Sequence, residues 1–141
     1  TYIELVATAT IMMILASAIL PMGRVAVRRQ REIELRRELR KMRQAVDLYK
    51  QAVDQGQIGG TDVKLGSEGY PPDLETLIRD GYMRKIPLDP MTKAADWVLT
   101  MEEEASEPDD INQVEPAVPG IIDVHSASKG KALDGTNYSD W

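Results

Sequence analysis

The sequence predicts an α+β protein in which one long N-terminal helix, its first half able to span a membrane, packs on a small antiparallel β-sheet. Three observations predict this fold class. The 141-residue chain begins with an apolar stretch, continues with apolar side chains three and four residues apart, and ends with short alternating segments between turns. We therefore divide it into an apolar helix half (1–23), a basic amphipathic helix half (24–55) and a small α+β head (56–141).

The apolar stretch from Leu5 to Met22 contains no charged side chain. In a helix it would be about 27 Å long, close to the hydrocarbon thickness of a bilayer. A secretory signal peptide would carry basic residues before its apolar core and a cleavage site after it. Here an arginine-rich segment follows instead, so we expect a processed membrane-spanning anchor that continues into a stem. The alternative is a buried core helix.

Pro21 and Gly23 lie at the end of this stretch. Proline removes one backbone donor and clashes with the preceding turn. We therefore expect the helix to be weakest between Ser17 and Gly23, where it could stretch or melt locally.

Glu4 is the only charged side chain before Arg24. An ionised carboxylate in hydrocarbon costs a few kcal/mol and needs a partner. The nearest cation is the amino group of Thr1. We expect this amine to point away from its own Glu4 and to neutralise Glu4 of an axially shifted neighbour, so that only one stagger pairs both charges. Alternatively, Glu4 lies in the headgroup layer.

The stem is basic and amphipathic, and the head is acidic. Between Arg24 and Lys50 there are ten basic residues against four acidic ones, although the whole chain carries a net charge of −6. This asymmetry suggests attraction between the stem of one copy and the head of another; the alternative is a solvated helix face. Nucleic-acid binding is disfavoured, because glutamates interrupt the arginines and aromatic residues are not interleaved. One apolar seam, which predicts packing against the head, consists of Leu35, Leu39, Met42, Val46, Tyr49 and Val53.

The head predicts one short helix and two strands. Pro71 and Pro72 exclude helix before them, and Asp73 is a suitable N-cap for a helix over 74–79. Residues 96–103 and 120–126 have strand-like patterns and should pair antiparallel. The acidic, proline-containing segment between them predicts an exposed loop.

The composition offers little for catalysis. There is no cysteine, which excludes disulfides and thiol chemistry, and His125 is the only histidine. We expect no enzymatic activity and no organic cofactor. Asp134, Asn137 and Asp140 supply hard oxygen ligands of the kind that calcium favours. The same spacing is also typical of a turn followed by an exposed end.

The N-terminal stretch TYIELVATATIMMILASAILP resembles type IV pilin-like proteins. Mature members begin Phe-Thr-Leu-Ile-Glu-Leu with an N-methylated Phe, so the match starts at the second residue of that motif. The resemblance implies that Thr1 and Glu4 take part in assembly and that Glu4 is the family's conserved acid. It also implies that Pro21 is its helix-breaking proline, followed here by Gly23.

Two further stretches, GYPPDLETLIRDGYMRKIPLDPMTKAADWVL and GIIDVHSASKGKALDGTNYSDW, resemble the head of the major pseudopilin of type II secretion systems. The resemblance is weakest over 56–68 and 101–118. It implies a type IV pilin-like fold, a single-pass inner-membrane protein with its head in the periplasm, and Trp141 as an apolar anchor of the tail on the sheet. It further implies a homopolymeric helical pseudopilus that acts as a piston or screw and drives folded proteins through an outer-membrane channel. Minor pseudopilins and the secretion machinery are its implied partners.

The resemblance also bears on calcium. Family members carry a C-terminal loop that often holds calcium, commonly as Gly-Ala-Asp-Gly, whereas this chain has SASKGKALDG in its place. Two other functions stay open from the sequence. One is a surface type IV pilus subunit for adhesion or motility, which would form an extracellular filament. The other is a membrane-anchored periplasmic binding domain that acts alone.

Overall fold

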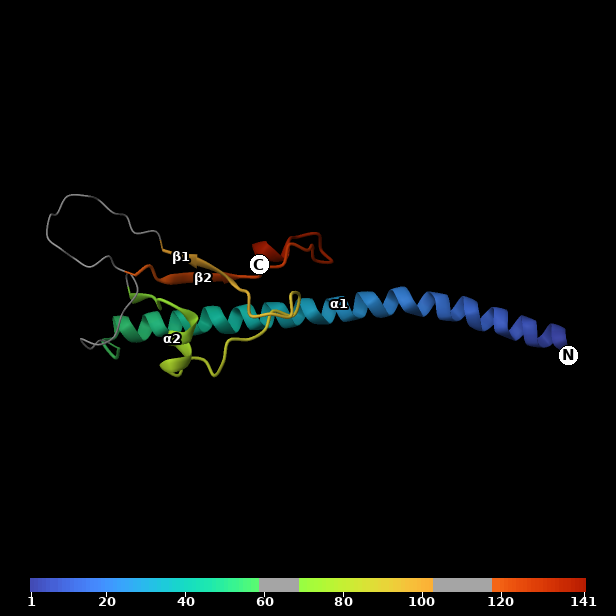
Figure 1. Ribbon diagram of the computed structural model, residues 1–141, viewed down its shortest axis with the longest axis horizontal. Helices are drawn as coiled ribbons and strands as arrows, with labels where there is room; N and C mark the ends of the chain where they lie inside the picture. The colour runs from blue at the N-terminus through green and yellow to red at the C-terminus, as the bar shows by residue number, and fades with distance from the viewer. Residues whose placement is uncertain (59–68, 103–117) are drawn as a thin grey trace.

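The computed structural model describes residues 1–58, 69–102 and 118–141 (Figure 1). The elements are helix α1 (Tyr2–Asp54), helix α2 (Leu74–Arg79), strands β1 (Val98–Met101) and β2 (Ile121–His125), and the short 3-10 helix η2 (Tyr138–Asp140). The predicted α+β layout, one long helix and a small antiparallel sheet, is confirmed. The predicted acidic loop lies mostly outside the described residues.

Helix α1 is a single element of 53 residues, which corresponds to about 80 Å. It ends where the sequence predicts. Gln55 is the C-cap, and Gly56 follows with a φ of 70°, a left-handed conformation that glycine adopts without a steric penalty.

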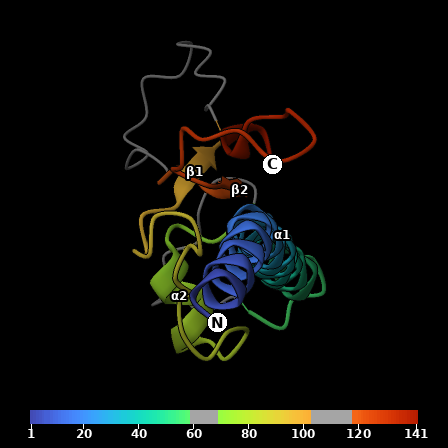
Figure 2. The same ribbon diagram turned by 90° about the vertical axis from the view of Figure 1, so that its right-hand side faces the viewer.

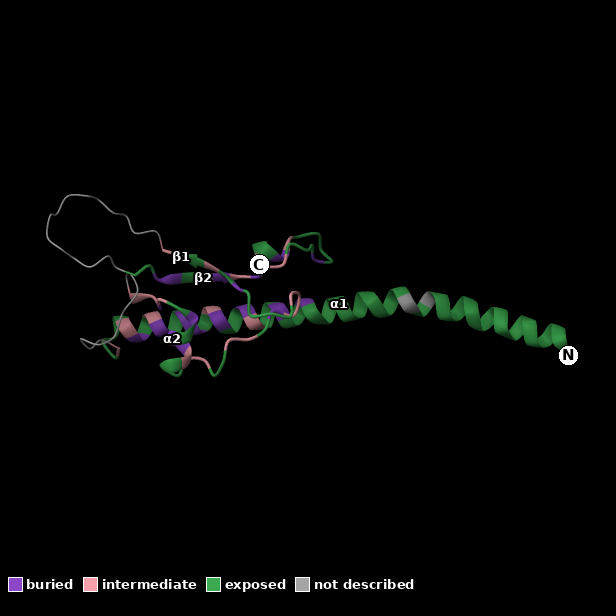
Figure 3. Ribbon diagram, in the orientation of Figure 1, coloured by how far each residue is buried: buried purple, intermediate pink, exposed green. Residues whose placement is uncertain are grey.

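The core forms along the second half of α1 (Figure 3). The predicted seam is confirmed, because every member from Leu35 to Tyr49 is buried and Val53 is half-buried. The head contributes the rest of one continuous apolar cluster: Leu74, Leu77, Trp97, Ile121, Val124, Ala132 and Tyr138. The core is therefore small and depends on the stem.

Helix α2 packs on this core and begins as predicted. The Asp73 side chain accepts a hydrogen bond from the Thr76 backbone N–H at 2.6 Å, which caps the first turn. Leu74 and Leu77 are buried against α1.

Strands β1 and β2 form the antiparallel sheet, both shorter than predicted. Leu99 is opposite Val124 and Thr100 is opposite Asp123, and the register then shifts before Met101. Val124 and Ile121 point into the core.

The sheet and α2 lie on different sides of α1 (Figure 2). After β2 the C-terminal segment returns along α1 toward its free half (Figure 1). As a result, residues after 127 form the edge of the head closest to the apolar half of the helix.

Candidate functional site

The first half of α1 projects from the head with all its described side chains exposed (Figure 3). Among the described residues, α1 is the one helix long and apolar enough to cross a membrane, and none of its apolar window is buried. The large apolar side chains exposed here are Tyr2, Ile3, Leu5, Val6, Ile11, Met12, Met13, Ile14, Leu15, Ile19, Met22, Val25 and Val27. Apolar surface on this scale marks a membrane or protein contact.

At the tip, Thr1 and Glu4 contact each other within one chain. The Thr1 nitrogen donates to Glu4 Oε2 at 2.9 Å, and both side chains are more than three-quarters exposed, at 76% and 78%. The expectation that this amine points away from its own Glu4 is wrong. Thr1 is the N-cap and Glu4 is the third helical residue, and a glutamate there reaches back to the N-cap nitrogen in a capping box.

Pro21 lies inside α1 and does not break it. The helix instead changes direction gently around residues 17–23 (Figure 1). Proline cannot donate to the carbonyl of Ser17, four residues earlier, so this turn lacks one backbone bond. Gly23 has open space where a Cβ would lie, so no close approach among the described residues requires glycine there.

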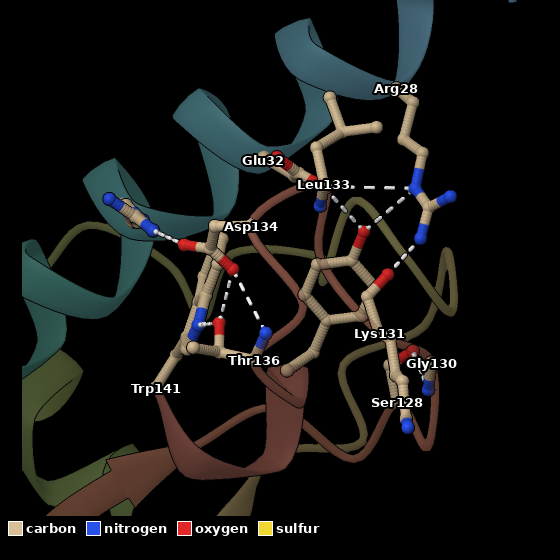
Figure 4. A network of polar contacts seen from close by, with 11 residues as sticks. Arg28, Glu32, Ser128, Gly130, Lys131, Leu133, Asp134, Thr136 and Trp141 are labelled. Atoms are coloured by element: carbon tan, nitrogen blue, oxygen red, sulfur yellow. Dashed lines mark hydrogen bonds and ion pairs between the residues drawn. The ribbon is translucent and has the colours of Figure 1, made fainter. Parts of the chain in front are cut away.

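Where α1 meets the head, a polar network crosses from the helix to the C-terminal segment (Figure 4). Glu32 is only 9% exposed, and its Oε1 accepts from the Tyr138 hydroxyl at 2.8 Å and from the Leu133 N–H at 2.9 Å. Arg28 donates to the Tyr138 hydroxyl at 3.2 Å and to the Lys131 carbonyl. Burial of the ring and the bond to Glu32 raise the pKa of Tyr138, and Arg28 partly opposes them.

This network was not predicted, although the sequence contains a signal for part of it. Arg28 and Glu32 extend the spacing of three and four residues that begins at Leu35, so they lie on the same helix face as the core. A buried glutamate requires partners. Its partners, Leu133 and Tyr138, are about a hundred positions away, at separations of 101 and 106.

The three suggested calcium ligands have protein partners. Asp134 accepts from the N–H and the hydroxyl of Thr136 and pairs with Arg36 at 3.2 Å. The Thr136 bonds and Arg36 lower the pKa of Asp134. The Asn137 amide donates to Asp140 at 2.9 Å.

Within 1–58, 69–102 and 118–141, no group of three or more Asp, Glu, His or Cys side chains is placed to hold a metal ion. The calcium site at Asp134, Asn137 and Asp140 stays a prediction.

The Trp141 ring lies against Arg36 of the stem, whereas the resemblance implies a position on the sheet. The guanidinium of Arg36 is 4.0 Å from the centre of its ring, and Tyr138 meets it edge-on at 5.2 Å. Its indole N–H donates to the Thr136 hydroxyl at 2.7 Å.

A second arginine fastens β2 to the stem. Arg43 donates to Asp123 Oδ1 at 2.6 Å, to the Val124 carbonyl at 3.0 Å and to the Trp141 carbonyl at 2.5 Å. Pairing between basic stem and acidic head therefore occurs within one chain. Such pairing between copies stays a prediction.

His125 lies at the end of β2. Its Nδ1 is 3.1 Å from the Trp141 carbonyl and its Nε2 is 3.4 Å from Asp123. Nearby, the fully buried Asp89 accepts from Ser126 Oγ at 2.5 Å and from the Met91 N–H at 2.7 Å. These bonds organise the loop before β1 and were not predicted.

The geometry therefore presents an exposed apolar helix with a charged tip, joined to a head through arginine contacts. A scan of this chain against models of known protein families finds no match, and neither curated proteins nor solved structures match it.

Proposed function

We propose that this protein is a structural subunit that polymerises into a helical filament, the pseudopilus of a type II secretion system. Copies wait in the inner membrane with the head in the periplasm and are then extracted into the filament. The observation that carries the proposal is the apolar half of α1, whose described side chains are all exposed. Support also comes from the sequence resemblance at residues 1–21.

The exposed apolar side chains of such a helix can be covered in two environments. Its backbone bonds are internal, so lipid can cover its side chains in a membrane. In a filament, the same side chains can pack against the helices of other copies. The transfer from lipid to protein exchanges one apolar environment for another, which keeps its free-energy cost low.

In the proposed filament, Glu4 limits the axial stagger between neighbouring helices. In the single chain its carboxylate pairs with the Thr1 amine in an exposed position. Between packed helices this pair would lose water, and a desolvated charge requires close partners. We propose that the amine of an axially shifted neighbour contacts Glu4 there, so that one stagger is favoured.

The contacts between stem and head suit a subunit that is extracted from the membrane by its helix. Arg43 and Glu32 connect the stem to β2 and to the C-terminal segment. The head therefore follows the helix as one body, while Pro21 leaves a turn with one bond fewer where α1 can stretch.

The proposal is tested with Glu4→Gln, and Glu34→Gln, an exposed stem glutamate, is the matched control. Cells carrying the assembly machinery should retain both variants in the membrane fraction. Glu4→Gln should give about tenfold fewer filaments by electron microscopy, because losing a charged contact costs roughly 1.5–3 kcal/mol. Glu34→Gln should match the parent.

Normal filaments from Glu4→Gln would contradict the role of Glu4. If the parent forms only discrete particles in every setting, the filament proposal is wrong and a binding domain that acts alone is favoured.

A further inference from the structure

We propose that a groove between α1 and the C-terminal segment binds the phosphate headgroup of an anionic phospholipid while the chain is in the membrane. The inference rests on the membrane-anchored state of the proposed function and goes beyond it. The groove has a volume of about 450 Å³ and is lined by Arg24, Val27, Arg28, Arg31, Met91, Ser128 and Tyr138. Figure 4 shows two of these residues, Arg28 and Ser128, with the Arg28 side chain directed toward the C-terminal segment.

The groove lies at the depth of the headgroups. The charge-free stretch of α1 ends at Met22, so Arg24 and Arg31 are about 3 and 14 Å further along the axis. The polar layer of one leaflet is about 5–8 Å thick. Helical side chains tilt toward the N-terminus of their helix, which here directs the long arginines back toward the membrane.

Within the described residues, Arg28 forms an ion pair with Glu32 at 3.7 Å, whereas the charges of Arg24 and Arg31 are not neutralised. Arg28 already donates hydrogen bonds to the Tyr138 hydroxyl and the Lys131 carbonyl. Glu32 is buried and accepts a hydrogen bond from Tyr138. Arg24 and Arg31 are exposed, and neither guanidinium forms an ion pair or hydrogen bond with the described part of the chain. Two guanidinium groups on one wall suit a phosphate, because their planar N–H groups match its oxygens.

The other lining groups favour a lipid over a free phosphate. Val27 and Met91 provide an apolar wall for the glycerol and the first methylenes, and the Ser128 hydroxyl can donate to an oxygen. From the groove, the acyl chains can continue along the apolar first half of α1. A soluble phosphate would use none of this apolar surface.

The test measures lipids retained by the full-length chain in detergent, using native mass spectrometry. The probes are dioleoyl phosphatidylglycerol and dioleoyl phosphatidylcholine in equal amounts. We expect retention of phosphatidylglycerol to be favoured by about five-fold per free arginine. Arg24→Gln with Arg31→Gln should abolish the preference, and a large excess of glycerol phosphate should not displace the bound lipid.

Arg29→Gln is the matched control for Arg31→Gln. Arg29 is closer to the membrane but lies on another face of α1, beside Pro21 and Val25. General attraction to an anionic surface would make Arg29→Gln the more harmful change, whereas the groove predicts that Arg31→Gln is. Equal losses from both, or displacement by glycerol phosphate, would overturn the inference.

Vesicle flotation separates this inference from the proposed function. A chain that floats with phosphatidylcholine vesicles but shows no lipid preference overturns the headgroup site and leaves the anchor intact. A chain that floats with neither lipid overturns the membrane-anchored state, and the headgroup site with it.

Discussion

At the residue scale, two buried tyrosines differ in what their hydroxyls contact. The Tyr138 hydroxyl donates to Glu32 and accepts from Arg28. The Tyr49 hydroxyl is buried and has no hydrogen-bond partner among the described residues. Burial raises the pKa of Tyr49, as it does that of Tyr138. A buried polar group without a partner weakens the folded state, whereas a bonded one supports it.

The same substitution should therefore have opposite effects at the two tyrosines. Tyr138→Phe leaves Glu32 with one partner fewer and should lower the free energy of unfolding by about 1–3 kcal/mol. Tyr49→Phe keeps the ring in the core and should be neutral or stabilising by up to about 1 kcal/mol. Thermal unfolding of the full chain in detergent, followed by circular dichroism, measures both. A larger loss from Tyr49→Phe than from Tyr138→Phe would contradict the described contacts.

At the element scale, the two halves of helix α1 lie in different environments. Its second half is held by the core, whereas the hydrogen bonds described for residues 1–23 all join groups of the helix itself, within four positions of each other. Local patterns were sufficient to predict both α-helices, because the seam predicted the stem and Asp73 after two prolines predicted α2. They did not predict η2. The continuity at Pro21 was less predictable, because proline bends or breaks a helix according to what surrounds it.

Replacing this proline should stiffen the first half of α1. Pro21→Ala restores a donor to the Ser17 carbonyl and removes a residue about 3 kcal/mol less favourable than alanine in a helix. Amides around residues 17–25 should then exchange up to about a hundredfold more slowly in detergent, as measured by hydrogen–deuterium exchange. Pro119→Ala, at an exposed proline outside the helices and strands, is the control and should leave α1 unchanged. Unchanged exchange in Pro21→Ala would remove Pro21 as the site of extension.

At the scale of the whole molecule, polar contacts decide how the head sits on the stem. Arg28, Glu32, Arg36 and Arg43 all contact the chain after residue 122. Sequence patterns report which face of an element is apolar, but not which distant polar groups meet across it. The strand pairing was therefore predictable, whereas the Glu32–Tyr138 contact was not. The expectation for Glu4 was wrong for a local reason, because a glutamate at the third helical position reaches back to the N-cap nitrogen.

The head should fold without the apolar helix half. No member of the core cluster precedes Leu35, and Arg28 is the first described stem residue bonded to the head. We expect residues 24–141 to be a folded monomer in water, with a melting temperature within about 4 °C of that of the full chain in detergent. A shorter fragment, 36–141, loses Arg28, Glu32 and Leu35 and should melt at a clearly lower temperature.

Circular dichroism and sedimentation velocity measure folding and association of both fragments. If 24–141 is unfolded, the apolar half contributes to the fold in a way that the described contacts do not include. If it associates as strongly as the full chain, the surface that drives assembly is on the head. A folded, monomeric 24–141 fragment beside a self-associating full chain would assign assembly to residues 1–23, because only the exposed apolar surface and the Thr1–Glu4 pair distinguish the two proteins.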